Sequence, residues 1–148
     1  MSTTITTLVR QHRDCDEAIE QVEACVRAKD WDAAAGAFAR LEFALQGNFS
    51  TEEQRLFPAF EQAVGFSNGP TAVMRHEHDE VRGLLDNARE WLELKDVAAL
   101  AAELDTLVVL LQQHNVKEEN VLFPMCQAQV KGLDTLLADF ASGPAAHP

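Results

Sequence analysis

Residues 52–58 read Glu-Glu-Gln-Arg-Leu-Phe-Pro and residues 118–124 read Glu-Glu-Asn-Val-Leu-Phe-Pro, so the chain repeats the pattern Glu-Glu-x-x-Leu-Phe-Pro after 66 residues. In the second copy, His114 stands four residues before Glu118, a spacing that places an imidazole and a carboxylate on one face of a helix, where both can reach one metal ion. The first copy has Asn48 at the corresponding position. The sequence therefore contains two related half-sites, one of which lacks a histidine.

The composition of the chain favours a single all-α domain. Its 148 residues suit one hydrophobic core. Hydrophobic residues make up 47% of them, with five prolines, seven glycines and no tyrosine, a balance that favours helices over sheets. The formal net charge of −12 would repel phosphate backbones and anionic lipid surfaces. Nucleic acids and membranes are therefore not expected as partners, and no protein partner is indicated.

The N-terminal residues and the cysteines favour a cytoplasmic location. Residues 1–11 lack the long apolar segment of a signal peptide, and the sequence has no run of about 18 apolar residues that could span a bilayer. Cys15, Cys25 and Cys126 show no Cys-x-x-Cys spacing, so neither a disulfide framework nor a thiolate metal site is expected. We expect a cytoplasmic protein whose cysteines are small core residues.

Apolar residues recur in steps of three and four in four segments, the pattern of helices that each bury one face. Asp30 is placed to cap the second segment. Residues 65–70, which read Gly-Phe-Ser-Asn-Gly-Pro, are typical of a break between helices and separate the second segment from the third. Long helices joined by short corners predict an antiparallel up-down-up-down four-helix bundle over residues 1–131. Residues 132–148 are expected to form a short helix over 133–140 and a flexible tail.

Pro58 and Pro124 follow the paired glutamates at the same interval in each repeat. A proline inside a helix lacks an amide hydrogen and crowds the preceding turn, so each proline is expected to kink or end the regular helix. The buried stripe of the fourth helix is expected to continue past Glu118 to Val121 and Met125.

Five ionisable residues lie within the apolar stripes and are predicted to face the interior at one level of the bundle: His12, Glu52, His78, His114 and Glu118. A buried carboxylate is costly unless it pairs, becomes neutral or binds a metal. Bundles build metal centres from side chains of facing helices. We therefore interpret these five residues as metal ligands.

Some neighbours of the five residues are candidates for further ligands or for supports of the ligands: Asn48, Glu53, Asp16 and Glu119. Asp16, one turn after His12, could orient that imidazole through its second nitrogen. A kinked helix could also turn Glu119 inward in place of Glu118. Asn48 is expected to donate a hydrogen bond in the core more readily than to bind metal through its weak amide oxygen.

In these residues the sequence resembles the hemerythrin-like (HHE cation-binding) family. The resemblance covers about residues 5–130 and rests on His12, the two Glu-Glu-x-x-Leu-Phe-Pro segments, Glu77-His78-x-x-Val81-Arg82 and His114. It implies a four-helix bundle with two non-haem iron ions, oxo- or hydroxo-bridged, held by terminal histidines and bridging carboxylates. It also implies binding or sensing of dioxygen, or handling of iron, peroxide or nitric oxide.

Two positions depart from the family pattern. The family usually has a histidine where this chain has Asn48, and its full oxygen carriers have another where this chain has Met74. Two irons would lack ligands unless water, Glu119 or Asn48 completes their coordination. Weaker binding, a single ion, or open positions suited to peroxide chemistry are the alternatives. Imidazole and carboxylate ligands suit iron or manganese and also accommodate zinc.

We expect a non-haem iron protein that binds dioxygen or a related small ligand such as peroxide or nitric oxide, and a binding protein more than an enzyme. An apolar pocket beside the metal is expected to be lined by Met74, Leu45, Val81 and Leu111. Two alternatives are a peroxidase- or catalase-like iron enzyme and a metal-free helical interaction module with a decayed site.

Overall fold

The computed structural model describes residues 2–137, whose regular structure is all helical. The order along the chain is α1 (Thr3–Arg27), α2 (Trp31–Thr51), the π-helical turn η1 (Glu52–Leu56), α3 (Phe57–Val64), α4 (Pro70–Glu93), α5 (Val97–Lys117), the π-helical turn η2 (Glu118–Leu122), α6 (Phe123–Gln129) and the 3-10 turn η3 (Leu133–Thr135). The predicted all-α fold is confirmed.

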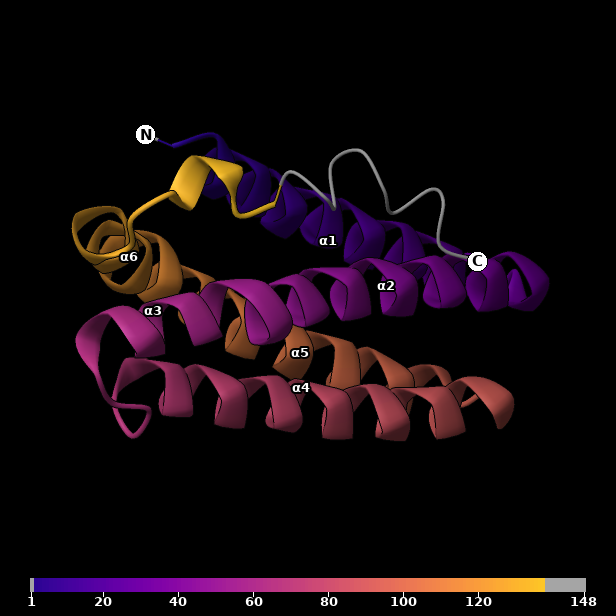
Figure 1. Ribbon diagram of the computed structural model, residues 1–148. Helices are drawn as coiled ribbons and strands as arrows, with labels where there is room; N and C mark the ends of the chain where they lie inside the picture. Colours follow the sequence, from indigo (N-terminus) through magenta and orange to yellow (C-terminus); the bar gives the residue numbers. More distant parts are fainter. Residues whose placement is uncertain (1, 138–148) are drawn as a thin grey trace.

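The four long helices pack in a ring. Helix α1 contacts α2 and α5, and helix α4 contacts the same two helices, so α1 lies diagonally opposite α4. Figure 1 shows the long helices running along one another, with α3 and α6 together at one end of the bundle. Short corners make successive helices antiparallel, and the predicted up-down-up-down bundle is confirmed.

Two corners of the bundle have the same local structure. Lys29 and Lys95 both have a φ of 55°, in the left-handed region that ends a helix. The next residue, Asp30 or Asp96, caps the following helix, because its carboxylate accepts a hydrogen bond from the backbone N–H three residues on. The two helical hairpins of the chain therefore turn in the same way, 66 residues apart.

The regular α-helix is interrupted before both prolines, as predicted, and the interruption takes the form of a π-helical turn. Neither Pro58 nor Pro124 can donate a backbone hydrogen bond. The phenylalanine before each proline donates its N–H to the carbonyl of a glutamate five residues back, Glu52 or Glu118. Each wider turn thus begins at the glutamate that faces the interior, and π-helical turns of this kind are frequent at functional sites.

The turn η2 shifts the buried face of the following helix by one residue. Spacing by α-helical turns predicts Val121 and Met125 on the buried side, but Val121 is 54% exposed and Met125 is only half-buried. Leu122 and Cys126 are buried in their place. The prediction for Val121 is wrong because the extra residue in the π-helical turn rotates every later side chain by about 100°.

A layer of polar side chains divides the interior into two apolar cores. The central core contains residues of α1, α2, α4 and α5, among them Leu41 and Leu104. The end core joins the first turns of α1 and α4 to α3, α6 and the segment around η3. Between the two cores lies a set of buried residues, which we call the polar layer and which comprises His12, Asn48, Glu52, His78, His114 and Glu118.

The chain beyond α6 returns to the start of α1. The hydroxyl of Thr4 donates a hydrogen bond to the carbonyl of Leu133 at 2.6 Å, and Leu133 and Leu137 are buried in the end core. Of the short helix predicted for residues 133–140, the structure has the turn η3; residues from 138 onward, with the predicted tail, lie outside the described residues. Within residues 2–137, every helix is too short or too polar to cross a membrane.

A large-to-small replacement at Leu104 tests the central core. Leu104 is 1% exposed, so Leu104→Ala should lower the free energy of unfolding by about 2–5 kcal/mol, because it removes buried methyl groups and leaves a cavity. Val109→Ala in the same helix, where the side chain is 53% exposed, should change it by less than about 0.5 kcal/mol. Urea denaturation followed by circular dichroism measures both, and equal effects would contradict this assignment of the core.

Candidate metal centre

Four side chains of metal-ligand type meet in the polar layer. Glu52, His78, His114 and Glu118 each offer one nitrogen or oxygen atom, and these atoms all lie within 4.8 Å of one another. All four residues are at most 1% exposed. His12 joins them, because its Nε2 lies 3.0 Å from Oε1 of Glu118. The structure thus brings together the five residues that the sequence selected, and we call them the His/Glu cluster.

Five atoms of the His/Glu cluster are buried without a hydrogen-bond partner among the described residues: Oε1 of Glu52, Nε2 of His78, Nε2 of His114 and both carboxylate oxygens of Glu118. Nε2 of His78 and Oε1 of Glu52 are 3.0 Å apart, yet they form no hydrogen bond. Unpartnered buried polar atoms are rare in native proteins and cost about 1–3 kcal/mol each. A cation between them would accept their lone pairs, so the residues present fit a bound metal ion.

Each histidine of the cluster is held by a further carboxylate. A carboxylate oxygen lies 2.6–2.8 Å from Nδ1 of each ring, in the pairs His78–Glu53, His12–Glu119 and His114–Glu77. When Nδ1–H donates to a carboxylate, the lone pair of Nε2 is left to face the cluster. Histidines that bind metals are usually oriented in this way.

The structure corrects the expected contact of Asp16 and shows where Glu118, Glu119 and Glu53 lie. Asp16 does not orient His12 as predicted, because the carboxylate of Glu119 holds Nδ1 of that ring at 2.8 Å and Asp16 is exposed. Glu118 is fully buried in the cluster, whereas Glu119 is 34% exposed and contacts the outer nitrogen of His12. Glu53 likewise supports a histidine and does not face the cluster.

Glu77 has a role that the sequence analysis missed. It is buried and contacts Nδ1 of His114, which is on a neighbouring helix. In the sequence, Glu77 stands directly before His78. Consecutive residues of a helix face different neighbours, so Glu77 is placed to contact a helix other than the one that His78 faces.

Two of the supporting carboxylates are neutralised by cations. Nη1 and Nη2 of Arg82 each donate to a carboxylate oxygen of Glu53 at 3.0 Å, and the ammonium of Lys117 lies 2.5 Å from Glu77. Burial tends to raise the pKa of Glu53 and Glu77, but hydrogen bonds from the cation and from the histidine outweigh it and lower the pKa of each below its usual value. Both carboxylates therefore remain ionised and can hold their imidazoles.

Without metal, the groups of the cluster differ in how tightly they hold protons. Burial disfavours the charged form of His12, but its contacts with Glu118 and Glu52 outweigh burial and raise its pKa to about 11. Burial and the charge of Glu118 raise the pKa of Glu52. Burial acts in the same direction on Glu118, but the contacts with Glu52 and the two nearby histidines outweigh it and lower the pKa of Glu118 to about 2. A metal ion bound here would displace protons.

Asn48 lies in the polar layer, and its amide group is engaged in a hydrogen bond. It is 3% exposed, and its Nδ2 donates to Oε1 of Gln11 at 2.9 Å. An amide nitrogen has no lone pair for a metal ion, and the amide oxygen is a weak ligand beside imidazole. The contact with Gln11 is the role that the structure shows for Asn48.

Phenylalanine rings cover the histidines of the cluster. Phe49 stacks on His78 with ring centroids 3.9 Å apart and an interplanar angle of 12°, and Phe57 lies against the same imidazole with centroids 5.6 Å apart. Phe123 is stacked near His12 at 5.8 Å. These rings, which the sequence analysis did not select, keep water from the imidazoles.

The four residues predicted to line a pocket are buried but do not surround one space. Leu45, Val81 and Leu111 belong to the central core, whereas Met74 belongs to the end core. They therefore belong to the two different cores that the polar layer separates.

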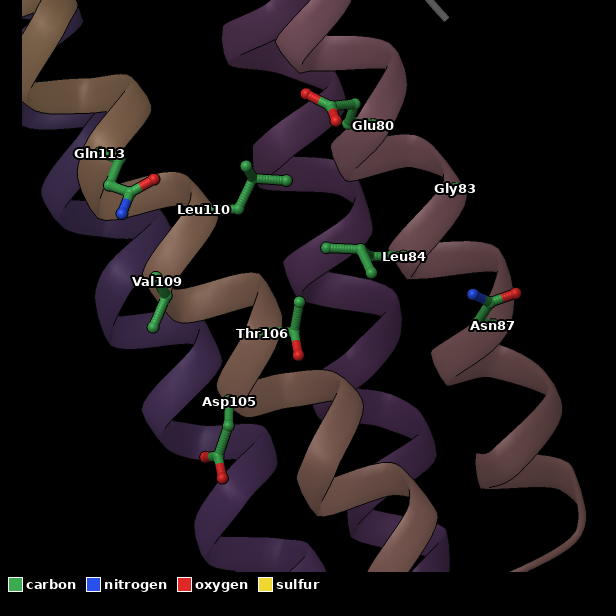
Figure 2. A pocket seen from close by; sticks show the side chains of 9 residues that line it. All are labelled: Glu80, Gly83, Leu84, Asn87, Asp105, Thr106, Val109, Leu110 and Gln113. Atoms are coloured by element: carbon green, nitrogen blue, oxygen red, sulfur yellow. The ribbon is translucent and has the colours of Figure 1, made fainter.

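A separate groove runs along the surface between α4 and α5 (Figure 2). It has a volume of about 790 Å³, with Leu84 and Leu110 at its base and polar residues such as Glu80, Asp105 and Gln113 around it. None of the lining residues belongs to the His/Glu cluster. The groove is therefore distinct from the candidate metal centre.

Comparison with known proteins places the chain among cation-binding domains. Residues 3–126 match the family model described as hemerythrin HHE cation binding domain. The iron-sulfur cluster repair protein YtfE of Edwardsiella ictaluri (strain 93-146) is 34% identical over 95 residues. This match covers 58% of the chain and 43% of that relative, so the chain spans less than half of the relative's length. No solved structure matches the chain.

The proton on His12 predicts how the stability of the metal-free protein depends on pH. Its pKa rises from 6.5 to about 11 on folding, so the stabilisation is complete below about pH 6.5 and is lost as the pH rises toward 11. Between about pH 6.5 and 8.5 the free energy of unfolding should fall, by at most about 1.4 kcal/mol per pH unit for one proton. Urea denaturation of the metal-free protein measures this slope. His12→Gln should flatten it, and the same slope in both proteins would contradict the assignment.

Proposed function

Because the chain belongs to the hemerythrin HHE cation-binding domain family, we propose that its His/Glu cluster binds non-haem iron and interacts there with dioxygen or a related small ligand. The observation that carries this proposal is the group of five buried nitrogen and oxygen atoms without hydrogen-bond partners in the described part of the chain. Imidazole and carboxylate donors in one site favour iron among the common biological metals and also suit manganese.

The protein's own part in this function is to hold and shield the ligands. Carboxylates on Nδ1 fix the orientation of the imidazoles, and the rings of Phe49 and Phe57 cover His78. Bound iron would supply redox chemistry and coordination positions for a small ligand. Dry apolar walls from the two cores would keep water from competing for those positions.

A second candidate function is the handling of iron for iron–sulfur centres. The similarity to the iron-sulfur cluster repair protein over 95 residues favours it. The match leaves more than half of that relative without a counterpart in this chain. Recovery of a damaged iron–sulfur enzyme on addition of the iron-loaded protein would favour this function over the binding of dioxygen.

Iron content is the direct test. Protein purified under iron-replete, reducing conditions should contain bound iron, and His78→Gln should lose it because Nε2 of this buried imidazole faces the cluster. His76→Gln is the matched control, since His76 lies on the same helix with a side chain 75% exposed. Metal analysis by mass spectrometry gives the iron per chain. No iron in the parent protein, or equal loss in both variants, would contradict the proposal.

The same preparation separates the remaining functions. Reversible spectral change on exposure to dioxygen would support ligand binding, and rapid turnover of peroxide would support a peroxidase- or catalase-like enzyme. A protein free of metal, with a stability that chelators do not change, would be a helical interaction module.

Removal of a supporting carboxylate should weaken metal binding without removing a ligand. Glu77→Gln should lower the affinity for iron by about 10- to 100-fold, because the amide supports the imidazole of His114 less well. Glu80→Gln, on the same helix and 49% exposed, should leave the affinity unchanged. Competition with a chelator of known affinity measures both, and no loss in Glu77→Gln would show that this contact does not act on the metal site.

A further inference from the structure

Residues of the polar layer come in pairs separated by 66 positions. His12 corresponds to His78, Glu52 to Glu118, and Asn48 to His114. The supporting residues follow the same interval, since Glu53 corresponds to Glu119 and Gln11 to Glu77. Corresponding residues lie on helices that are diagonally opposite in the bundle, so the layer has an approximate internal twofold relation.

In one of the two related halves of the layer, charged side chains form a chain of contacts. Lys117 contacts Glu77 at 2.5 Å, and Glu77 contacts Nδ1 of His114 at 2.8 Å. The opposite nitrogen of that ring is buried, has no hydrogen-bond partner among residues 2–137 and faces the cluster. This half therefore presents a nitrogen ligand that is backed by a negative charge.

In the other half, the corresponding contact joins two uncharged side chains. Gln11 and Asn48 stand in the places of Glu77 and His114, and Oε1 of Gln11 accepts from Nδ2 of Asn48 at 2.9 Å. Thr51 corresponds to Lys117, and its hydroxyl donates to the carbonyl of Gly47. Ligand, supporting carboxylate and cation are thus replaced together, and the replacements satisfy one another within the fold.

The ligands around the layer are therefore divided unequally. Glu52, His78, His114 and Glu118 offer atoms within 4.8 Å of one another, enough for one four-ligand site. On the side of Asn48, His12 is the only imidazole that the described residues supply, and its Nε2 is already hydrogen-bonded to Oε2 of Glu52 at 3.4 Å. Any ion there would depend on His12 and on carboxylate oxygens shared with the first site.

We propose that the chain holds one metal ion tightly between Glu52, His78, His114 and Glu118, and that a second position beside His12 takes a divalent cation only weakly and in exchange with solution. This inference rests on the proposed function, because it concerns the same metal. The loss of a supporting carboxylate accounts for about 10- to 100-fold in affinity, and the loss of an imidazole ligand adds to it. We expect the two positions to differ in affinity by at least about 100-fold.

A ferrous-ion titration of the metal-free protein without oxygen, in competition with a chelator, tests the inference. The parent chain should retain one iron and bind a second at least about 100-fold more weakly. The double variant Asn48→His with Gln11→Glu restores the missing ligand and its carboxylate, and it should retain two. The mirror variant His114→Asn with Glu77→Gln gives both halves the neutral Gln–Asn contact in place of the histidine and its carboxylate, and it should retain none.

The outcomes separate this inference from the proposed function. Two ions of equal affinity in the parent chain would overturn the unequal sites and leave the iron protein standing. No bound iron at all would contradict both. A second affinity unchanged by Asn48→His with Gln11→Glu would show that these two residues do not cause the inequality, and would overturn the inference. Should that variant fold poorly, Asn48→His alone serves, because Oε1 of Gln11 can still accept from Nδ1–H of the new ring, and it should raise the second affinity.

Discussion

Two carboxylates, those of Glu52 and Glu118, lie side by side in the middle of an apolar bundle, and the rest of the interior is arranged around them. Their ligand atoms lie within 4.8 Å of each other, and two negative charges so close together cannot both persist without nearby positive charge. In the metal-free protein, a proton on His12 supplies it, as the raised pKa of this imidazole indicates. Burial and the charge of Glu118 also raise the pKa of Glu52. A metal ion supplies it more completely, since it also satisfies the imidazole nitrogens that otherwise have no partner among the described residues.

Contacts between opposite charges extend from the buried histidines to the surface. The buried imidazoles of His78 and His114 contact Glu53 and Glu77, and these carboxylates contact the partly exposed side chains of Arg82 and Lys117. Each step pairs opposite charges, so the buried groups are stabilised without a free charge in the core. Substitution of one of these residues would weaken the other contacts in the same chain.

Much of the bundle and the inward residues could be predicted from periodicity. The stripes placed His12, Glu52, His78, His114 and Glu118 at one level, because an α-helix keeps its register over many turns. The supports of the histidines were harder to predict, since the contact of Glu119 with His12 and of Glu77 with His114 joins different helices. The exposure of Val121 depends on a π-helical turn, which shifts the register and leaves no mark in the apolar spacing itself.

The polar layer also affects how the molecule unfolds, because it separates the central core from the end core. Without metal, the polar groups of the layer between the two cores satisfy one another incompletely. Cooperative unfolding requires strong coupling between the parts of a structure. An ion bound to side chains of α4, α5 and both π-helical turns would supply that coupling, so the same bonds that serve the site would also make the bundle unfold as a single unit.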